Sequence, residues 1–196
     1  MKMVNCIKEL CVGCHQCETA CAVEHSNSGS VFDAVAEPVR ALPRIKIKLS
    51  KDKKWSIPLK CRHCNPAPCS KACIAGAIRR VIPTGHIIID EYRCTGCKAC
   101  IAACPFGAIQ FGISNRPGNF HHVAIKCDEC IDRNKVGKLP VCVESCKTGA
   151  LIVSSLNQEL KEKKRQANEI IFGSTAGSSD APSDYRLFFS LKNTIV

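Results

Sequence analysis

Short apolar runs separated by turn-forming residues fill the first three quarters of the chain. The runs are brief and rich in β-branched residues, which is typical of short strands. We therefore expect strands at residues 3–7, 78–82, 86–90, 109–111 and 151–153.

From residue 155 the pattern changes. Ser155 and Gln158 have the spacing of a capping box, with Ser followed three residues later by Gln. Leu156, Leu160, Ile170 and other scattered apolar residues then alternate with many charged ones. This pattern predicts a charged surface helix that continues to about residue 172.

A longer polar connection precedes the middle of the chain. Residues 26–30 are rich in Ser, Asn and Gly, and residues 44–49 and 55–59 predict the arms of a hairpin around the turn 50–54. A second connection, at residues 115–119, has the composition of a linker.

The composition changes again near the end of the sequence. Residues 173–184 are rich in Gly, Ser, Ala and Asp, which is typical of a flexible segment, and residues 185–196 are apolar. We hypothesise that this apolar end docks on a partner subunit, and the alternative is that it folds back onto the rest of the chain. No apolar run approaches the length of about twenty residues that a membrane helix needs, so we expect no direct membrane insertion.

Cysteine is the most informative residue, because sixteen of the 17 cysteines fall into four groups of four. The first and third groups have the spacing C-x2-C-x2-C-x3-C of bacterial ferredoxins, and Pro105 follows the third. In that motif three closely spaced thiolates bind one cluster and the fourth binds the other cluster of a pair. Four such groups predict four complete [4Fe-4S] sites. The groups are Cys11, Cys14, Cys17 and Cys21; Cys61, Cys64, Cys69 and Cys73; Cys94, Cys97, Cys100 and Cys104; and Cys127, Cys130, Cys142 and Cys146.

Two other uses of cysteine fit the spacing less well. A four-cysteine zinc site takes two C-x2-C pairs separated by a loop and leaves no third cysteine two residues on. A secreted disulfide scaffold is usually shorter, and Lys2, Lys8 and Glu9 make the first ten residues unlike a secretion signal. Thiolates that are kept reduced for iron favour a cytoplasmic location.

A second repeat accompanies the cysteines. After the last cysteine of groups two, three and four comes x-x-Gly-Ala and an aliphatic residue, with the glycines at Gly76, Gly107 and Gly149. A small residue there lets the backbone turn into a strand and lets amide N–H groups approach the sulfurs. Group one differs, because the residues after Cys21 predict a continuing helix. The repeat indicates duplication of a two-cluster ferredoxin module.

The spacing of the groups predicts the domain organisation. Groups two and three are close in sequence and predict one inserted lobe at residues 57–117. Groups one and four then form the other lobe, from residues 1–56 and 118–153, and residues 154–196 hold the helix, linker and tail. The expected fold class is α+β, with two bacterial-ferredoxin-like lobes that each hold two clusters among short strands and short helices. Because metal binding then contributes to folding, we expect the metal-free chain to be unfolded or molten.

The formal charge of +11 suggests nucleic-acid binding, but that count omits the cofactors. An oxidised cluster with its four thiolates carries about −2, so four of them reduce the net charge to about +3. The lysines at 46, 48, 51, 53 and 54 and the charged run 161–165 are more typical of solvated faces, and some of them could guide an acidic redox partner.

Three residues near the groups need separate interpretation. Cys6 is left over and is expected to pack in the first strand as a small apolar residue. His15 and His63 lie inside cysteine groups, but the four sets are complete, so we expect them to support the ligands or lie at the surface. The sequence contains no paired carboxylates, nucleophile triad or Gly-rich phosphate loop, so we expect no catalytic residues.

The motifs as a set resemble a known family. Cys-Arg-His-Cys-Asn-Pro-Ala-Pro-Cys in group two and Lys-Cys-Asp-Glu-Cys in group four are similar to the four-cluster electron-transfer subunits of the dimethyl-sulfoxide-reductase type. The resemblance covers about residues 3–153. The opening run from Cys11 to Ser26 is most similar to the ferredoxin-like partner of carbon monoxide dehydrogenase. Proline is missing after Cys21, Cys73 and Cys146, which departs from simple ferredoxins.

This resemblance implies both the ligand sets and the function. Each set would take three cysteines from one group and the fourth from another group of the same lobe. The chain would relay low-potential electrons between a catalytic subunit, with carbon monoxide dehydrogenase as the first choice, and a hydrogenase or a flavin oxidoreductase. The alternatives are the relay subunit of a formate dehydrogenase, formate-linked hydrogenase or molybdopterin reductase, and a free polyferredoxin. The implied sets are Cys11, Cys14, Cys17 with Cys146; Cys127, Cys130, Cys142 with Cys21; Cys61, Cys64, Cys69 with Cys104; and Cys94, Cys97, Cys100 with Cys73.

Overall fold

The structure, a computed structural model, describes residues 2–52, 54–114, 116, 118 and 121–172. The chain divides into two compact units, Met1–Ser154 and Ser155–Val196. The predicted flexible segment and apolar tail at 173–196 lie outside the described residues. The division of the first unit into two lobes stays a prediction.

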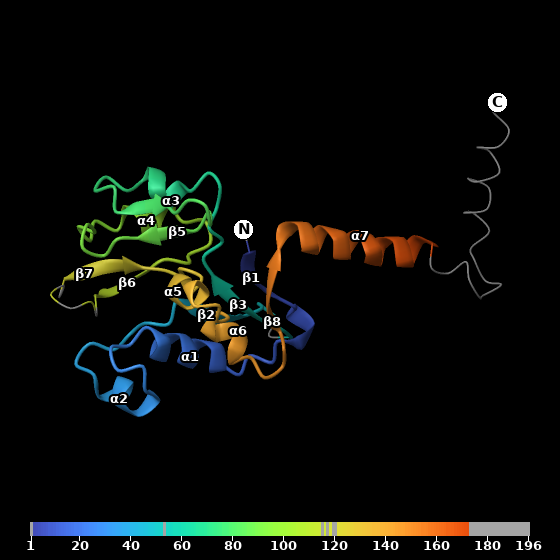
Figure 1. The fold of residues 1–196 in the computed structure, drawn as a ribbon, viewed down its shortest axis with the longest axis horizontal. Helices are drawn as coiled ribbons and strands as arrows, with labels where there is room; N and C mark the ends of the chain where they lie inside the picture. The colour runs from blue at the N-terminus through green and yellow to red at the C-terminus, as the bar shows by residue number, and fades with distance from the viewer. Residues whose placement is uncertain (1, 53, 115, 117, 119–120, 173–196) are drawn as a thin grey trace. The chain divides into compact units, whose positions relative to one another are not determined.

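The first unit consists of short elements joined by turns (Figure 1). Its strands form two-stranded sheets, and each sheet pairs consecutive strands except one, in which β1 pairs with β8. The helices have between four and nine residues, apart from one 3₁₀ turn. In chain order the elements are β1 (Lys2–Cys6), the 3₁₀ turn (Lys8–Leu10), α1 (Gln16–Glu24), α2 (Val31–Ala36), β2 (Ile45–Leu49), β3 (Ser56–Lys60), α3 (Pro68–Lys71), β4 (Ile78–Arg80), β5 (Ile87–Ile89), α4 (Ala99–Ala103), β6 (Gln110–Ile113), β7 (His122–Ile125), α5 (Ile131–Lys135), α6 (Val141–Glu144) and β8 (Leu151–Ser155).

Most of the elements expected from the sequence are present. The predicted hairpin is the antiparallel pair β2–β3, in which Ile45 lies opposite Lys60 and Leu49 opposite Ser56. The continuing helix predicted after Cys21 is the last turn of α1. No hydrophobic pattern predicts α2, because this six-residue helix has no buried face and its Phe32 is 89% exposed.

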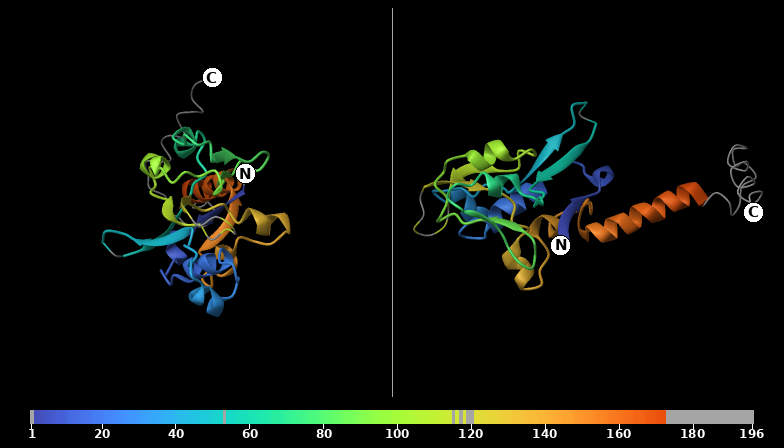
Figure 2. Two further views of the ribbon diagram at one scale, coloured as in Figure 1. Left: turned by 90° about the vertical axis from the view of Figure 1, so that its left-hand side faces the viewer. Right: turned by 90° about the horizontal axis from the view of Figure 1, so that it is seen from above.

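The β1–β8 sheet joins segments that lie about 150 positions apart in the sequence, and the views in Figure 2 show these strands side by side. The Ile7 amide donates to the Ala150 carbonyl at 2.8 Å, and the Asn5 amide side chain donates to Ser154 Oγ at 2.7 Å. This sheet brings cysteine groups one and four to the same part of the unit.

The buried apolar residues gather into separate clusters, and cysteines form a large part of each. One cluster combines Val4, Ile45 and Leu151 with cysteines of groups one and four, and α1 packs against α6 there. A second cluster combines Ile87 and Ile109 with cysteines of groups two and three, and α3 packs against α4. The apolar core is therefore built around the predicted ligands.

The second unit is described only as α7 (Leu156–Phe172). The predicted capping box is confirmed, because the Ser155 amide donates to Gln158 Oε1 at 2.9 Å and the Gln158 amide donates to Ser155 Oγ at 3.3 Å. The helix extends to Phe172, the last described residue, so its predicted end near residue 172 stays a prediction. Among the described residues no helix has both the length and the apolar character needed to span a membrane.

Candidate metal centres

Each cysteine group is shaped by a tight loop followed by a short helix. Cys17 and Cys21 lie in α1, Cys69 in α3, Cys100 in α4 and Cys142 in α6. The loops before these helices contain residues with positive φ, which turn the chain sharply around the first cysteines of each group.

The repeated turn after the last cysteine is also present. The amide of Gly149 donates to the Cys146 carbonyl at 3.2 Å, and Gly76 and Gly107 make the same bond to Cys73 and Cys104. All three glycines have positive φ, between 57° and 68°. The turn directs the following backbone amides toward the sulfur, and hydrogen bonds from residues 148, 150 and 151 reach Cys146.

The first cavity combines group one with the last cysteine of group four. Its cysteines are Cys11, Cys14, Cys17 and Cys146, and Ile47 of β2 also lines it. These cysteines reach one cavity because the β1–β8 sheet brings the two groups together.

Two further cavities combine groups two and three in a crossed manner. One is lined by Cys61, Cys64, Cys69 and Cys104. The other is lined by Cys73, Cys94, Cys97 and Cys100. In both cases three cysteines come from one group and one comes from the other, and most other lining residues are apolar.

Of the remaining four cysteines, Cys21, Cys130 and Cys142 lie near one another. Cys21, Cys127, Cys130 and Cys142 are all buried. Beyond the effect of burial, Cys130 and Cys21 raise the pKa of Cys142, which requires that these sulfurs be close. The structure thus places three of the implied cysteine sets around shared cavities, and the fourth set stays a prediction.

The donor sets and the cavities fit iron–sulfur clusters. Each of the three cavities is lined by four cysteines, and a [4Fe-4S] cluster takes four thiolate ligands. A lone zinc ion would draw the four sulfurs to about 2.3 Å from one point.

Burial makes several of these thiols hard to ionise without a metal. It raises the pKa of Cys17 and Cys130 to about 12 and that of Cys100 to about 11. Cys146 differs: burial raises its pKa, but hydrogen bonds from the Thr148 hydroxyl and from nearby backbone amides lower it below the usual value. A bound cation would offset the cost of the buried thiolates.

Backbone amides also lie close to several sulfurs. The amide of Arg44 donates to Cys21 Sγ at 3.2 Å, that of His63 to Cys61 Sγ at 3.4 Å and that of Glu129 to Cys127 Sγ at 3.4 Å. Such bonds stabilise negative charge on sulfur and raise the reduction potential of a bound cluster.

Cys6, His15 and His63 occupy different environments. Cys6 is half-buried at the end of β1, where it packs against the first apolar cluster, and its predicted packing role is confirmed. His15 is exposed and pairs with Glu18 at 3.1 Å. His63 is 1% exposed, so the alternative of a surface position is wrong for this residue.

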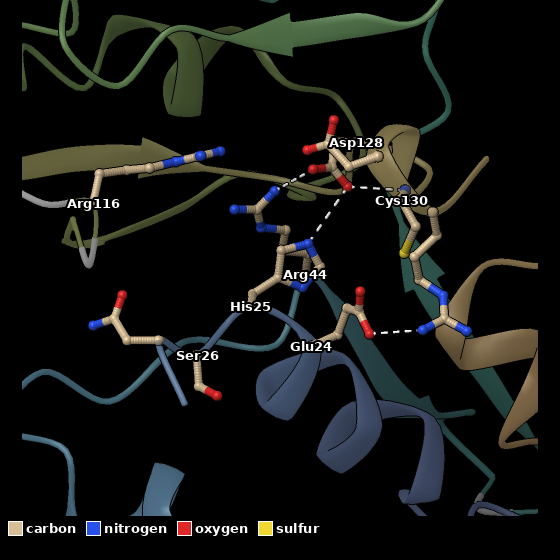
Figure 3. Close-up of a pocket in the computed structure, with 10 residues that line it drawn as sticks. Glu24, His25, Ser26, Arg44, Arg116, Asp128 and Cys130 are labelled. Carbon is tan, nitrogen blue, oxygen red and sulfur yellow. Dashed lines mark hydrogen bonds and ion pairs between the residues drawn. The ribbon is translucent and has the colours of Figure 1, made fainter. Parts of the chain in front are cut away.

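A polar cavity that the sequence did not indicate lies beside Cys130 (Figure 3). There the guanidinium of Arg44 and the imidazole of His25 both face the Asp128 carboxylate, at 2.5 Å and 3.6 Å. Burial lowers the pKa of His25, but hydrogen bonds to Asp128 and Cys21 outweigh it and raise the value to about 9. Arg44 also reaches Glu91 at 3.6 Å, so it connects the hairpin region to the segments around groups three and four.

We expect Arg44→Met to destabilise the protein by about 3 kcal/mol, or roughly 6–12 °C in Tm. The substitution leaves the largely buried Asp128 carboxylate without its guanidinium partner. The measurement is the thermal midpoint of the cluster-loaded protein. Arg165→Met, which removes an exposed arginine paired with Glu162 and Glu169, is the control and should change the midpoint little. Equal midpoints for both variants would contradict a structural role for Arg44.

Comparison with known proteins identifies related sequences. The family described as "4Fe-4S dicluster domain" matches residues 53–156. An iron-sulfur protein of Rhodospirillum rubrum is 39% identical over 172 residues, which cover 82% of this chain and 86% of the relative. The electron transport protein HydN of Escherichia coli K12 is 34% identical over 83% of this chain and 94% of the relative. Formate hydrogenlyase subunit 2 of the same strain is 32% identical over 86% and 88%.

Proposed function

The chain belongs to the family of 4Fe-4S dicluster iron–sulfur proteins, and we propose that it is an electron-transfer subunit that holds four [4Fe-4S] clusters. The observation that carries this proposal is the grouping of sixteen cysteines into four sets of four, three of which line separate cavities. The proposed ligands are the four cysteine sets given above. Each set takes three cysteines from one group and the fourth from another group.

A bound [4Fe-4S] cluster supplies reversible storage of one electron. The chain's own residues hold each cluster, exclude water from it and set its potential. Apolar side chains such as Ile78, Ile87 and Ile47 line the cavities, and backbone amides donate to the sulfurs. In this proposal the chain makes and breaks no bond in a substrate, and it acts by keeping several one-electron sites close together.

The crossed ligand sets support a short path between clusters. Cys61 and Cys127, from two different sets, lie in one small buried cluster with Ala108, and Cys104 packs against it. A second connection runs through α1, where Cys17 and Cys21 are one helical turn apart but belong to two different sets. Adjacent sets are therefore linked by short stretches of buried protein, as sequential electron transfer requires.

Two candidates for the catalytic partner follow from different observations. The resemblance of residues 11–26 favours carbon monoxide dehydrogenase, with a hydrogenase or flavin oxidoreductase as the second redox protein. The similarity to formate hydrogenlyase subunit 2 favours a formate-linked hydrogenase or a formate dehydrogenase. The formate-linked candidate has the support of a named relative, whereas carbon monoxide dehydrogenase rests on the sequence resemblance.

The native complex, isolated without oxygen, separates these candidates. Its clusters would be reduced by carbon monoxide in one case and by formate in the other, and the change can be followed by electron paramagnetic resonance. A chain that purifies alone, with clusters that neither compound reduces through any associated subunit, would instead be a free polyferredoxin.

The cluster content gives the direct test of the proposal. We expect about sixteen iron and about sixteen acid-labile sulfide per chain after anaerobic purification, because four complete cysteine sets bind four clusters. Metal analysis and sulfide determination on the same sample provide the measurement. Iron near eight per chain, or zinc in stoichiometric amount, would contradict the four-cluster proposal.

A further inference from the structure

Four ionisable side chains are buried together where two of the proposed cluster sites approach each other. They are Lys60, His63, Lys126 and Glu129, and each is between 1% and 7% exposed. Their neighbours include Cys61 and Cys127, which lie in the same small apolar cluster. Charged groups are rarely buried without a partner or a function, so this group requires an explanation.

The two lysines occupy equivalent places in the chain. Lys60 ends β3 and precedes Cys61, and Lys126 follows β7 and precedes Cys127. Each ammonium donates to the carbonyl of the cysteine that follows it, Lys60 at 3.4 Å and Lys126 at 2.9 Å. The corresponding positions in groups one and three are Leu10 and Arg93, which are exposed. Buried lysines are thus specific to groups two and four.

The lysines differ in how their charge is balanced. Lys60 Nζ donates to Glu129 Oε1, and the other oxygen of Glu129 accepts a hydrogen bond from the Val4 amide at 3.0 Å. Lys126 Nζ donates to backbone carbonyls, those of Ile87 and Cys127. Within the described part of the chain Lys126 has no carboxylate partner.

His63 is a neutral neighbour and does not balance the positive charge of Lys126. Its Nδ1 accepts a hydrogen bond from the Ile87 amide at 2.9 Å, so the other ring nitrogen carries the proton of a neutral imidazole. The ring is therefore neutral and leaves the charge of Lys126 unbalanced.

Each lysine lies beside the cysteine set of the other group, and not beside the set that contains the cysteine following it in the chain. Lys126 bonds to the carbonyl of Ile87, which lines the cavity of Cys61, Cys64, Cys69 and Cys104. Lys60 Nζ donates to the Glu129 carboxylate, and the Glu129 amide donates to Cys127 Sγ at 3.4 Å. The arrangement is therefore crossed, because each lysine ammonium lies near the proposed cluster site of the other cysteine group.

We propose that Lys126 is the buried counter-cation of the cluster held by Cys61, Cys64, Cys69 and Cys104, and that it raises the reduction potential of this cluster. The inference rests on the proposed four-cluster function. A one-electron reduction adds one negative charge to the cluster, and an ammonium in a site of low dielectric stabilises that charge. Glu129 cancels the corresponding effect of Lys60 on the site of Cys127, Cys130, Cys142 and Cys21.

The test is a potentiometric titration of the cluster-loaded full-length protein, followed by electron paramagnetic resonance. In Lys126→Met we expect one of the four reduction steps to move to lower potential. The ratio of reduced to oxidised cluster at a fixed potential should fall at least tenfold, which for one electron is about 59 mV. In Glu129→Gln a different step should move to higher potential, because the charge of Lys60 is no longer balanced.

Three controls keep the interpretation specific. Lys126→Arg retains the positive charge, so its reduction potential should be close to that of the wild-type protein. A defect that only disturbed the structure would not be reversed in this way. Lys147→Met removes an exposed lysine beside Cys146, and solvent screening should leave every step in place. Iron content shows whether each variant is fully loaded, and a variant that loses iron is replaced by Lys126→Gln, which keeps a polar side chain.

The possible outcomes are distinct. An unchanged titration of fully loaded Lys126→Met or Lys126→Gln overturns the inference while leaving the four-cluster proposal intact. Movement of the same step in the lysine and the glutamate variants also overturns it, because the two residues would then act on one site. Wild-type protein with fewer than four reduction steps and low iron would instead defeat the proposed function itself.

Discussion

Removal of iron by an anaerobic chelator is expected to unfold the unit of residues 1–154. Its buried apolar clusters include Cys17, Cys21, Cys100, Cys127 and Cys142, all of which are proposed ligands of the metal. The sheets have only two strands each, and such sheets are marginal in isolation. A structural zinc site contributes on the order of 10 kcal/mol to folding, whereas a whole domain is stable by about 5–15 kcal/mol. The loss of four sites of comparable strength therefore exceeds the stability available.

Circular dichroism and amide hydrogen exchange provide the measurements for this prediction. Protection of the amides in the β2–β3 hairpin should be lost when iron is removed, and it should return when iron and sulfide are restored. A chelated protein that keeps native exchange protection would show that the protein atoms alone hold the fold.

Cys146→Ser is expected to disturb the cluster whose other ligands are Cys11, Cys14 and Cys17, more than a hundred residues earlier. Serine is a poor substitute for a thiolate ligand, so this site should lose its cluster or bind a species with altered spectra. Iron content should fall from about sixteen by about one to four atoms per chain, according to whether one iron or a whole cluster is lost. Cys21→Ser should in the same way affect the site of Cys127, Cys130 and Cys142.

Cys6→Ser is the matched control for both substitutions. Cys6 lies at the end of β1 and packs against the same apolar cluster as Cys146, but it belongs to none of the four sets. Its replacement should leave the iron content and the spectra unchanged. If Cys146→Ser altered only the signals assigned to Cys127, Cys130 and Cys142, the crossed assignment of ligands would be wrong.

Much of the local structure could be predicted because cysteine spacing and turn residues act over short distances. The two arms of the hairpin differ from the predicted ranges by one residue at their ends, and the capping box at Ser155 has the expected bonds. Cysteine groups and Gly-Ala turns recur at fixed offsets, so a single turn geometry is repeated along the chain. The gathering of the cysteine sets agrees with the family resemblance, although their role as ligands stays a proposal.

The buried polar residues were the part that sequence reasoning missed. Lysine is usually solvated, so the residue type alone does not predict that Lys60 and Lys126 are buried. The available signal was the shared pattern Lys-Cys-x-x-Cys in groups two and four, which groups one and three lack. The ion pair between Arg44 and Asp128 could not be predicted from the sequence, because the two positions are 84 residues apart and no repeat connects them.

The pairing of β1 with β8 has a consequence for biosynthesis. Cys11, Cys14 and Cys17 leave the ribosome early, but the segment that supplies Cys146 is synthesised about 130 residues later. At about 5–20 residues per second this delay is on the order of ten seconds. During that interval three N-terminal thiols lack the strand and the fourth sulfur that would enclose them, whereas groups two and three can already assemble with each other. The site of Cys11, Cys14 and Cys17 can therefore be completed only near the end of the synthesis of residues 1–154.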